Sequence, residues 1–235
     1  MTIFNMAYLK SSWWWGWWQP WANTLVYYNI NDNDTNSYIY DLSWNNHTQT
    51  WSWTAAYTTD ATYGRVAVFN GNSDTYTSAW SIVDFWSECT FIALFYRNNV
   101  SSSSAIVTEC ASSSSYPIWI ACEVANKYQW WYAWAGNWNA HIQSTSDAVA
   151  NQWVMIATTR ASDGTAKIYI NWTLDNTVSW MATPNYTSWN NLRIWNWRGT
   201  YYPINWKFKL FIGENRTWSD AEIAALAQEY GFTVS

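Results

Sequence analysis

Glycine, charge and long apolar runs are all scarce in this chain of 235 residues. Only 11% of the residues are charged, where about 25% is usual, and no apolar stretch reaches the roughly 18 residues of a membrane-spanning helix. The 11 Lys and Arg residues are outnumbered by 16 Asp and Glu residues and form no basic run. This balance argues against a nucleic-acid binder that neutralises phosphates. The 49% hydrophobic content argues against intrinsic disorder.

The N-terminus lacks the features of an ordinary signal peptide, namely a basic start, an apolar run and a small-residue cleavage site. We expect residues 1–12 to form a leader or anchor and residues 13–23, which include WWWGWWQPW, to form a low-complexity linker. The remaining residues, 24–235, are long enough for one large β domain.

Cysteine is limited to Cys89, Cys110 and Cys122. Their number and spacing match neither a metal motif nor a disulfide framework. Two alternatives remain open: buried free thiols, or one bridge between Cys110 and Cys122 on neighbouring strands. The redox compartment stays undetermined.

Short runs rich in β-branched and aromatic residues dominate the chain beyond residue 24, and clusters of turn-forming residues separate them. Such a series predicts an antiparallel sandwich or barrel rather than alternating strands and helices. The predicted strands cover 24–28, 65–70, 90–97, 105–110, 116–122, 127–133, 140–144, 153–160, 166–170, 191–195 and 205–212.

One helix is predicted near the C-terminus. Ser219 and Glu222 form the capping box S-x-x-E, and Gly231 is in position to end the helix. Trp218 before the cap and Ile223 at the fourth helical position match a hydrophobic staple. We expect this helix to pack on an edge of the sandwich.

Tryptophan is as abundant as glycine is rare: 24 Trp accompany 8 Gly, where ordinary usage of about 7% would give about 16 Gly. Several Trp stand where tight turns require glycine. Asn171-Trp172 joins two strand-like runs, and both residues of such a hairpin turn need a positive φ. Trp44 and Trp206 also follow residues that precede glycine in turns. We hypothesise that many of these Trp are encoded by UGA codons that the source organism reads as glycine; a truly Trp-rich protein is the alternative.

Several motifs follow one another along the chain: DLSWNN (41–46), RVAVFNG (65–71), WVMIAT (153–158) with SDG (162–164), KIYINW (167–172), NWKFKLF (205–211) and NRTWSDAEI (215–223). Together they resemble the laminin G-like domains of the concanavalin A-like lectin and glucanase superfamily, with Trp in place of Gly as the main departure. The resemblance implies an all-β, two-sheet antiparallel jelly roll with one short C-terminal helix. A leader and linker before such a module also resemble the arrangement in bacteriophage tail or virion-surface proteins.

Aromatic side chains next to amides form candidate sugar sites, because sugars stack on flat rings while amides bind their hydroxyls. The candidates are Tyr128, Trp131, Tyr132, Asn137 and Tyr201. The alternative is that alternate residues of this stretch belong to the core.

Oxygen ligands for calcium occur at Asp41, Ser43 and Asn45, which together with Asp60 supply part of a candidate site. Calcium is the one cofactor that the sequence suggests. An ordinary Asx turn in a loop is the alternative interpretation.

Catalytic carboxylates in the E-x-D-x-x-E pattern of glycanases are missing from the sequence, and Asp84 and Glu88 alone form a weak pair. We therefore expect no enzyme but a carbohydrate-binding or adhesion module on a virion, extracellular or cell surface. Its expected partners are a surface glycan or polysaccharide and, in addition, a second copy of the chain or other virion proteins. The alternatives are a structural spacer domain without sugar binding and a glycoside hydrolase.

Overall fold

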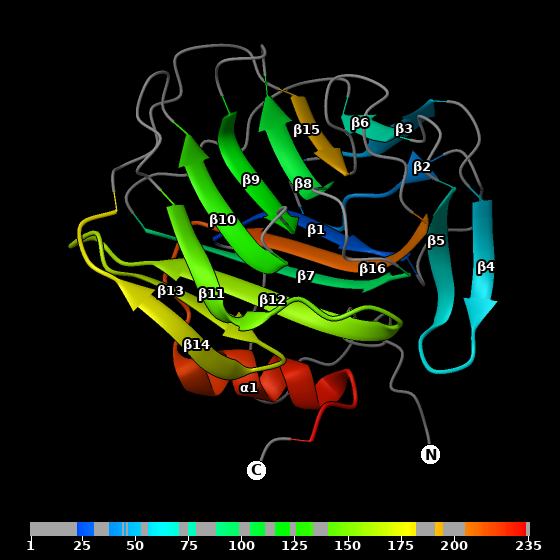
Figure 1. Ribbon diagram of the computed structural model, residues 1–235. Coiled ribbons are helices and arrows are strands. Elements are labelled where there is room, and N and C mark those ends of the chain that lie inside the picture. The colour runs from blue at the N-terminus through cyan, green and yellow to red at the C-terminus, as the bar shows by residue number, and fades with distance from the viewer. Residues whose placement is uncertain are drawn as a thin grey trace, which may run out of the picture.

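The computed structural model of the protein describes residues 23–30, 38–43, 45, 47–52, 56–70, 75–78, 88–98, 104–110, 116–122, 126–133, 141–181, 191–194 and 205–233. Within these residues the chain forms two antiparallel sheets and one helix (Figure 1). The predicted two-sheet all-β sandwich with a short C-terminal helix is therefore confirmed. The predictions for residues 1–22 lie outside the described residues. No helix in the described part of the chain is long and apolar enough to cross a membrane.

Sheet A contains eight strands, and its long strand β16 is shared between two neighbours on one side. The first half of β16 pairs with β5, and the second half pairs with β1. The order is β14 (Thr173–Val178), β13 (Ala166–Ile170), β12 (Gln152–Arg160), β7 (Cys89–Arg97), β16 (Asn205–Glu214), β5 (Gly64–Asn70) and β4 (Ala56–Asp60), with β1 (Thr24–Asn29) beside β16.

Sheet B also contains eight strands and lies across the core from sheet A (Figure 1). Its order is β11 (His141–Asp147), β10 (Lys127–Ala133), β9 (Tyr116–Cys122), β8 (Ser104–Cys110), β15 (Asn191–Ile194), β6 (Thr75–Ser78), β3 (Gln49–Ser52) and β2 (Tyr38–Ile39).

The register of β8 decides between the two cysteine alternatives. Cys122 of β9 pairs with Ser104 at the start of β8, whereas Cys110 ends β8 and pairs with Asn191 of β15. Six residues of strand separate the two positions, about 20 Å at the usual rise per residue. A disulfide needs Cα atoms within about 7 Å, so Cys110 and Cys122 form no bridge. Cys89 is a buried free thiol.

The main core lies between the sheets and is built around aromatic contacts from β7 to β10. The Phe91 and Trp130 rings meet edge to face at 5.5 Å, and the Phe95 and Tyr128 rings do so at 6.2 Å. Most of β7 is buried on both faces, which explains the uninterrupted apolar run over residues 91–95.

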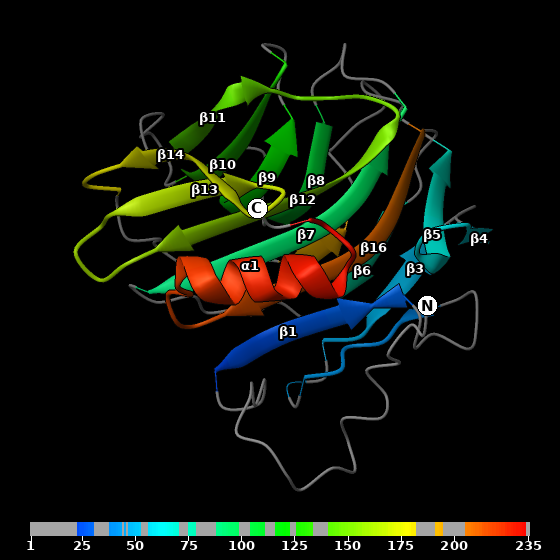
Figure 2. The same ribbon diagram turned by 90° about the horizontal axis from the view of Figure 1, so that it is seen from below.

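Helix α1 (Asp220–Glu229) has the capping box that the sequence predicts, with Ser219 as N-cap and Glu222 at the third position. It packs on the outer face of sheet A rather than on an edge of the sandwich as predicted (Figure 2). The reason is a second apolar layer on this face. Its buried members are Tyr27, Ile92, Leu94, Met155, Ala157, Tyr169, Leu210, Ile212, Trp218, Ile223, Leu226 and Ala227.

The predicted hairpin turn between β13 and β14 has a positive φ at both central residues, 51° at Asn171 and 80° at Trp172. Trp180 also has a positive φ of 68° and is 88% exposed. Trp206 does not have the backbone conformation that would require glycine at this position. It is buried in β16 without a positive φ and packs against Phe95 at 5.2 Å between ring centroids. Trp44 lies outside the described residues.

Candidate functional site

Tyr128, the first residue of the predicted sugar site, is fully buried. Its ring packs on Phe95 between the sheets, and its hydroxyl accepts a hydrogen bond of 3.1 Å from the Val149 N–H. The ring therefore has no face for a sugar, and the prediction for Tyr128 is wrong. The physical reason is the two-residue alternation of β10, in which Tyr128 and Trp130 both belong to the core.

The predictions for the other candidate sugar-binding residues are not tested by the described part of the protein. Trp131 and Tyr132 lie in β10, but their side chains are outside the described part of the protein. Asn137 and Tyr201 lie outside the described residues altogether.

Asp41, the centre of the predicted calcium loop, organises the loop through its own hydrogen bonds. Its Oδ1 accepts the N–H groups of Tyr27 and Ser43, each at 2.9 Å. Its Oδ2 accepts the Ser43 hydroxyl at 2.7 Å and the His47 N–H at 2.8 Å. The positive ends of four dipoles thus surround the carboxylate where a cation would bind.

Asn45 and Asp60 do not complete a calcium site either. Asn45 presents its amide nitrogen, which donates to the carbonyl oxygens of Thr24 and Leu25 at 3.1 and 3.0 Å. Asp60 belongs to the β4–β5 hairpin and pairs with Lys207 at 2.7 Å. The described residues include no cluster of three His, Cys, Asp or Glu side chains suited to a metal ion. The residues chosen from the sequence therefore do not fit calcium, and the Asx-turn interpretation describes Asp41 better.

The Asp41 loop still affects the ionisation of its neighbours. Burial lowers the pKa of His47, an effect that the charge of Asp41 only partly offsets. Burial, followed by the charge of Asp41, raises the pKa of Tyr28 well above its usual value. Both shifts favour neutral side chains, and the Tyr28 hydroxyl donates to the His47 carbonyl oxygen at 2.6 Å. The loop is thus a structural link between β1 and β3.

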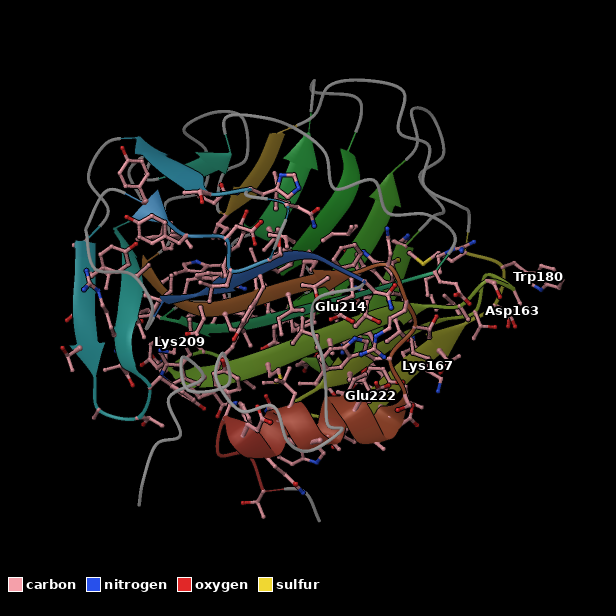
Figure 3. The ribbon with its side chains drawn as sticks, turned by 180° about the vertical axis from the view of Figure 1, so that it is seen from behind. Asp163, Lys167, Trp180, Lys209, Glu214 and Glu222 are labelled. Atoms are coloured by element: carbon pink, nitrogen blue, oxygen red, sulfur yellow. The ribbon has the colours of Figure 1, made fainter. Side chains whose placement is uncertain are left out.

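A pocket of about 550 Å³ lies where the β12–β13 hairpin meets the start of α1. We call it the α1 pocket. Figure 3 shows two of its lining residues, Lys167 and Glu222, beside one end of the helix. The lining consists of Thr159, Ala161, Thr165, Lys167, Thr217, Trp218, Ser219, Asp220, Ala221 and Glu222.

The two carboxylates of the α1 pocket are each paired with a cation. Asp220 Oδ1 lies 3.1 Å from Lys167 Nζ and accepts the Tyr169 hydroxyl at 2.7 Å. Glu222 Oε1 lies 2.6 Å from the Arg216 guanidinium, and its Oε2 accepts the Ser219 N–H at 2.8 Å. The lining therefore combines polar groups with little net charge.

These contacts keep both carboxylates ionised. The hydrogen bonds from Tyr169 and Lys167 lower the pKa of Asp220 below its usual value. Burial alone would raise the pKa of Glu222, but the Ser219 N–H and Arg216 outweigh it and lower that pKa. Neither group is prepared to act as a general acid near neutral pH.

Trp218 and Glu214 fix the segment that leads into α1. The Trp218 indole N–H donates to Glu214 Oε2 at 2.6 Å, and the Trp218 backbone N–H donates to the Thr90 hydroxyl at 2.9 Å. Glu214 Oε1 also accepts the Thr24 hydroxyl at 2.8 Å. Strands β1, β7 and β16 thus hold one wall of the α1 pocket in place.

Sequence reasoning missed the α1 pocket. The sequence identifies Ser219 and Glu222 as a helix cap and places Lys167 in the predicted strand 166–170. Because about 50 residues separate the two walls, no local pattern shows that they meet.

The comparisons with known proteins reveal a shared fold. No family model matches the sequence, and no curated protein matches it either. Among solved structures, domain 4 of AbnA, an extracellular GH43 arabinanase from Geobacillus stearothermophilus solved in complex with arabinotriose, matches with a TM-score of 0.69 and 14% identity. The match covers 87% of this chain and 98% of that domain.

Two toxin binding domains are similar to the chain over part of their length. The binding domain of Paraclostridial Mosquitocidal Protein 1 gives a TM-score of 0.71 at 14% identity, with 88% of this chain and 52% of that chain covered. The binding domain of Botulinum neurotoxin DC in complex with rat synaptotagmin II gives 0.69 at 16%, with 89% and 52% covered. The protein therefore spans about half of these binding domains. Identities this low establish the sandwich fold alone.

Proposed function

We propose that the protein is a non-catalytic carbohydrate-binding or adhesion module. The observation that carries the proposal is the match to the arabinanase domain, which extends over nearly the whole of a domain solved with a bound trisaccharide. The toxin binding domains of the same fold support a role in recognition in general. Because one fold hosts many functions, the ligand has to be tested directly.

The electrostatics support binding without catalysis. A glycosidase needs one carboxylic acid of raised pKa beside a second, ionised carboxylate. The two carboxylates of the α1 pocket, Asp220 and Glu222, both have a lowered pKa. Of the weak catalytic pair from the sequence, Glu88 is exposed in front of β7, and Asp84 lies outside the described residues.

The finer family assignment remains our proposal of a laminin G-like domain. The capping box of α1 and the positive φ of Asn171 support it, because both fall in motifs that carry the resemblance. We extend the proposal to display on a virion, extracellular or cell surface, where repeated copies would raise a weak single-site affinity.

A spacer domain without a ligand is the second candidate. The burial of Tyr128 favours it, since this residue was expected to contribute to the sugar site.

The proposed function is tested with a multimerised form of the protein on an array of neutral and acidic glycans. We assign the sugar face to the outer side of strand β10, with Trp131, Asn137 and Tyr201 as its members. The alternation that buries Tyr128 and Trp130 leaves Tyr132 out of this face. Tyr201→Ala is expected to lower the array signal at least tenfold. Tyr38→Ala, at a partly exposed tyrosine of β2 in the same sheet, is the control that retains binding. No signal from the unaltered multimer would refute the function.

We also propose that the natural chain carries glycine at positions 172 and 180. The positive φ at both residues supports this, because a bulky side chain is strained in that region. We expect UGA codons at these positions in the source gene, and UGG codons there would refute the proposal of glycine. Tyr201 was chosen for the binding test because its identity does not depend on the codon question.

A further inference from the structure

The α1 pocket has the dimensions and the chemistry of a small-ligand site outside the proposed sugar face on β10. Its volume of about 550 Å³ falls within the range of about 300–1,000 Å³ typical of ligand sites. Its walls come from β12, β13, the turn between them and the start of α1. Buried residues of sheet A support both walls, so the hollow is built on fixed elements.

The backbone groups at the N-terminus of α1 are not the basis for proposing a ligand site here. The Ser219 hydroxyl accepts the Glu222 N–H, and the Glu222 carboxylate accepts the Ser219 N–H, so the capping box already uses these groups. The groups that remain for a ligand are side chains. Asp220 Oδ2 takes no part in the bonds to Lys167 and Tyr169, and Lys167 Nζ has further protons to donate. The Thr165 hydroxyl already donates to Asp163, but its oxygen can still accept a hydrogen bond.

A carboxylate acceptor beside an ammonium donor and threonine hydroxyls suits a vicinal diol, which donates one hydrogen bond and accepts another. The methyl groups of Ala161 and Ala221 supply apolar surface for the C–H side of a sugar ring. The paired charges around the pocket also restrict the class of sugar that it can bind. Lys167 of the lining pairs with Asp220, and Arg216, which lies outside the lining, pairs with Glu222. No unpaired cation of the described lining therefore attracts an acidic sugar.

We propose that the α1 pocket is a second carbohydrate subsite and that it takes a neutral sugar. The inference rests on the proposed function and deepens it by adding a subsite on sheet A and a ligand class. A sugar here would bind on the opposite side of the sandwich from the face assigned to β10, so one glycan chain or two could be engaged by each module.

The test fills the α1 pocket without removing any of its contacts. Ala221 is exposed and lines the pocket, whereas Ala225 is exposed on the same helix face one turn further on and does not line it. Ala221→Tyr should block the subsite. Ala225→Tyr carries the same helix-propensity cost and leaves the pocket open, so it is the matched control.

The probes are arabinotriose as a neutral sugar and N-acetylneuraminic acid as an acidic one, titrated into the unaltered protein and both variants and followed by calorimetry or by NMR. The glycan array supplies a further neutral probe if it identifies one. We expect Ala221→Tyr to weaken binding of the neutral sugar at least tenfold and Ala225→Tyr to change it less than twofold. Thr165→Val, which keeps the shape and removes one hydroxyl, should weaken it about threefold or more.

The outcomes separate this inference from the proposed function. Glycan binding that is lost in Tyr201→Ala and unchanged in Ala221→Tyr would leave the function standing and refute the α1 subsite. Binding of the acidic sugar in preference to the neutral one, with loss in Ala221→Tyr, would refute the ligand class. No binding of any glycan by the unaltered protein would refute both.

Discussion

Two tryptophans occupy backbone conformations that favour glycine. Trp172 and Trp180 have φ values of 80° and 68°, where a side chain costs on the order of 1–2 kcal/mol. Trp172 recovers part of this cost through its ring, which lies 5.5 Å from the Phe232 ring. Trp180 is 88% exposed and extends away from the body of the protein (Figure 3). The strain at Trp180 is thus offset by little burial.

Replacing Trp180 with glycine should therefore stabilise the protein. We expect Trp180→Gly to raise the free energy of unfolding by about 1 kcal/mol, because the relief of strain exceeds the extra entropy of glycine in the unfolded chain. In a domain of this size that corresponds to a rise in Tm of about 2–4 °C, measurable by calorimetry. Trp180→Ala keeps a Cβ at the same φ and should gain much less. A loss of stability in the glycine variant would contradict the strain argument.

For single residues, the sequence predicts those backbone conformations that depend only on the neighbouring residues in the chain. The turn at Asn171-Trp172 could be predicted because a tight hairpin demands a positive φ whatever the rest of the fold does. Tyr128 could not be placed correctly, because alternation separates the two faces of a strand without telling which face is buried. Trp180 lacks any local turn motif. The next residue, Met181, donates its N–H to the Gly164 carbonyl oxygen, a contact between distant residues that no local pattern shows.

Helix α1 is held at its start by a charged network that acid should weaken. The Glu222 carboxylate accepts hydrogen bonds from Ser219 and pairs with Arg216, and these contacts lower its pKa although burial opposes them. A carboxyl group with a lowered pKa in the folded state stabilises the fold above its unfolded pKa. That contribution is lost as the pH falls through the folded value.

Glu222→Gln should lower the free energy of unfolding at pH 7 by about 0.5–1 kcal/mol, the usual range for a cap with a partly exposed ion pair. Urea unfolding at pH 7, 5 and 3 checks this, and the difference from the unaltered protein should shrink between pH 5 and 3. Glu229→Gln in the last turn is the control. Burial raises the pKa of Glu229, so this variant should lose no stability at pH 7. If Glu222→Gln lowers the free energy of unfolding as much at pH 3 as at pH 7, the negative charge of Glu222 does not contribute to the stability of the fold.

Among the elements, the strands that bury apolar residues could be predicted, and several short or polar strands could not. The run over residues 91–95 of β7 is apolar because both faces of this strand are covered. The predicted list omits β2, β3, β4, β6 and β14. Strand β4, with the sequence AYTTD, lies at the end of sheet A and is mostly exposed, so it shows no apolar alternation. The helix was predicted from its cap, but its position on the face of sheet A depends on apolar residues of five strands, β1, β7, β12, β13 and β16.

For the molecule as a whole, Asp175 joins the two sheets along one edge. It lies in β14 of sheet A, and its carboxylate accepts the N–H groups of Thr145 and Ser146 in β11 of sheet B. The neighbouring Asn176 amide donates to the Gln143 carbonyl oxygen at 2.8 Å. Outer strands of both sheets are thus tied together by side chains rather than by a continuous ladder.

Asp175→Ala should therefore loosen this edge while leaving the centre of the sandwich intact. We expect amide hydrogen exchange to accelerate at least tenfold at Thr145 and Ser146, which lose their acceptor, and less steeply along the rest of β11 and β14. Strand β7, which lies at the centre of sheet A, should exchange as before, because its protection reflects global unfolding. The loss in unfolding free energy should be about 1 kcal/mol or less, since the contacts are partly exposed.

Asp147→Ala on the same strand is the matched control for this experiment. Asp147 forms an exposed ion pair with Lys127 within sheet B, at 2.6 Å, so its removal takes away a charge on β11 without touching the link between the sheets. Exchange at Thr145 and Ser146 should stay close to that of the unaltered protein in this variant. If both variants accelerate exchange equally, the charge of β11 matters and the link through Asp175 does not. If neither variant accelerates exchange, the apolar core alone holds the two sheets together, and the Asp175 carboxylate contributes little to the stability of this edge.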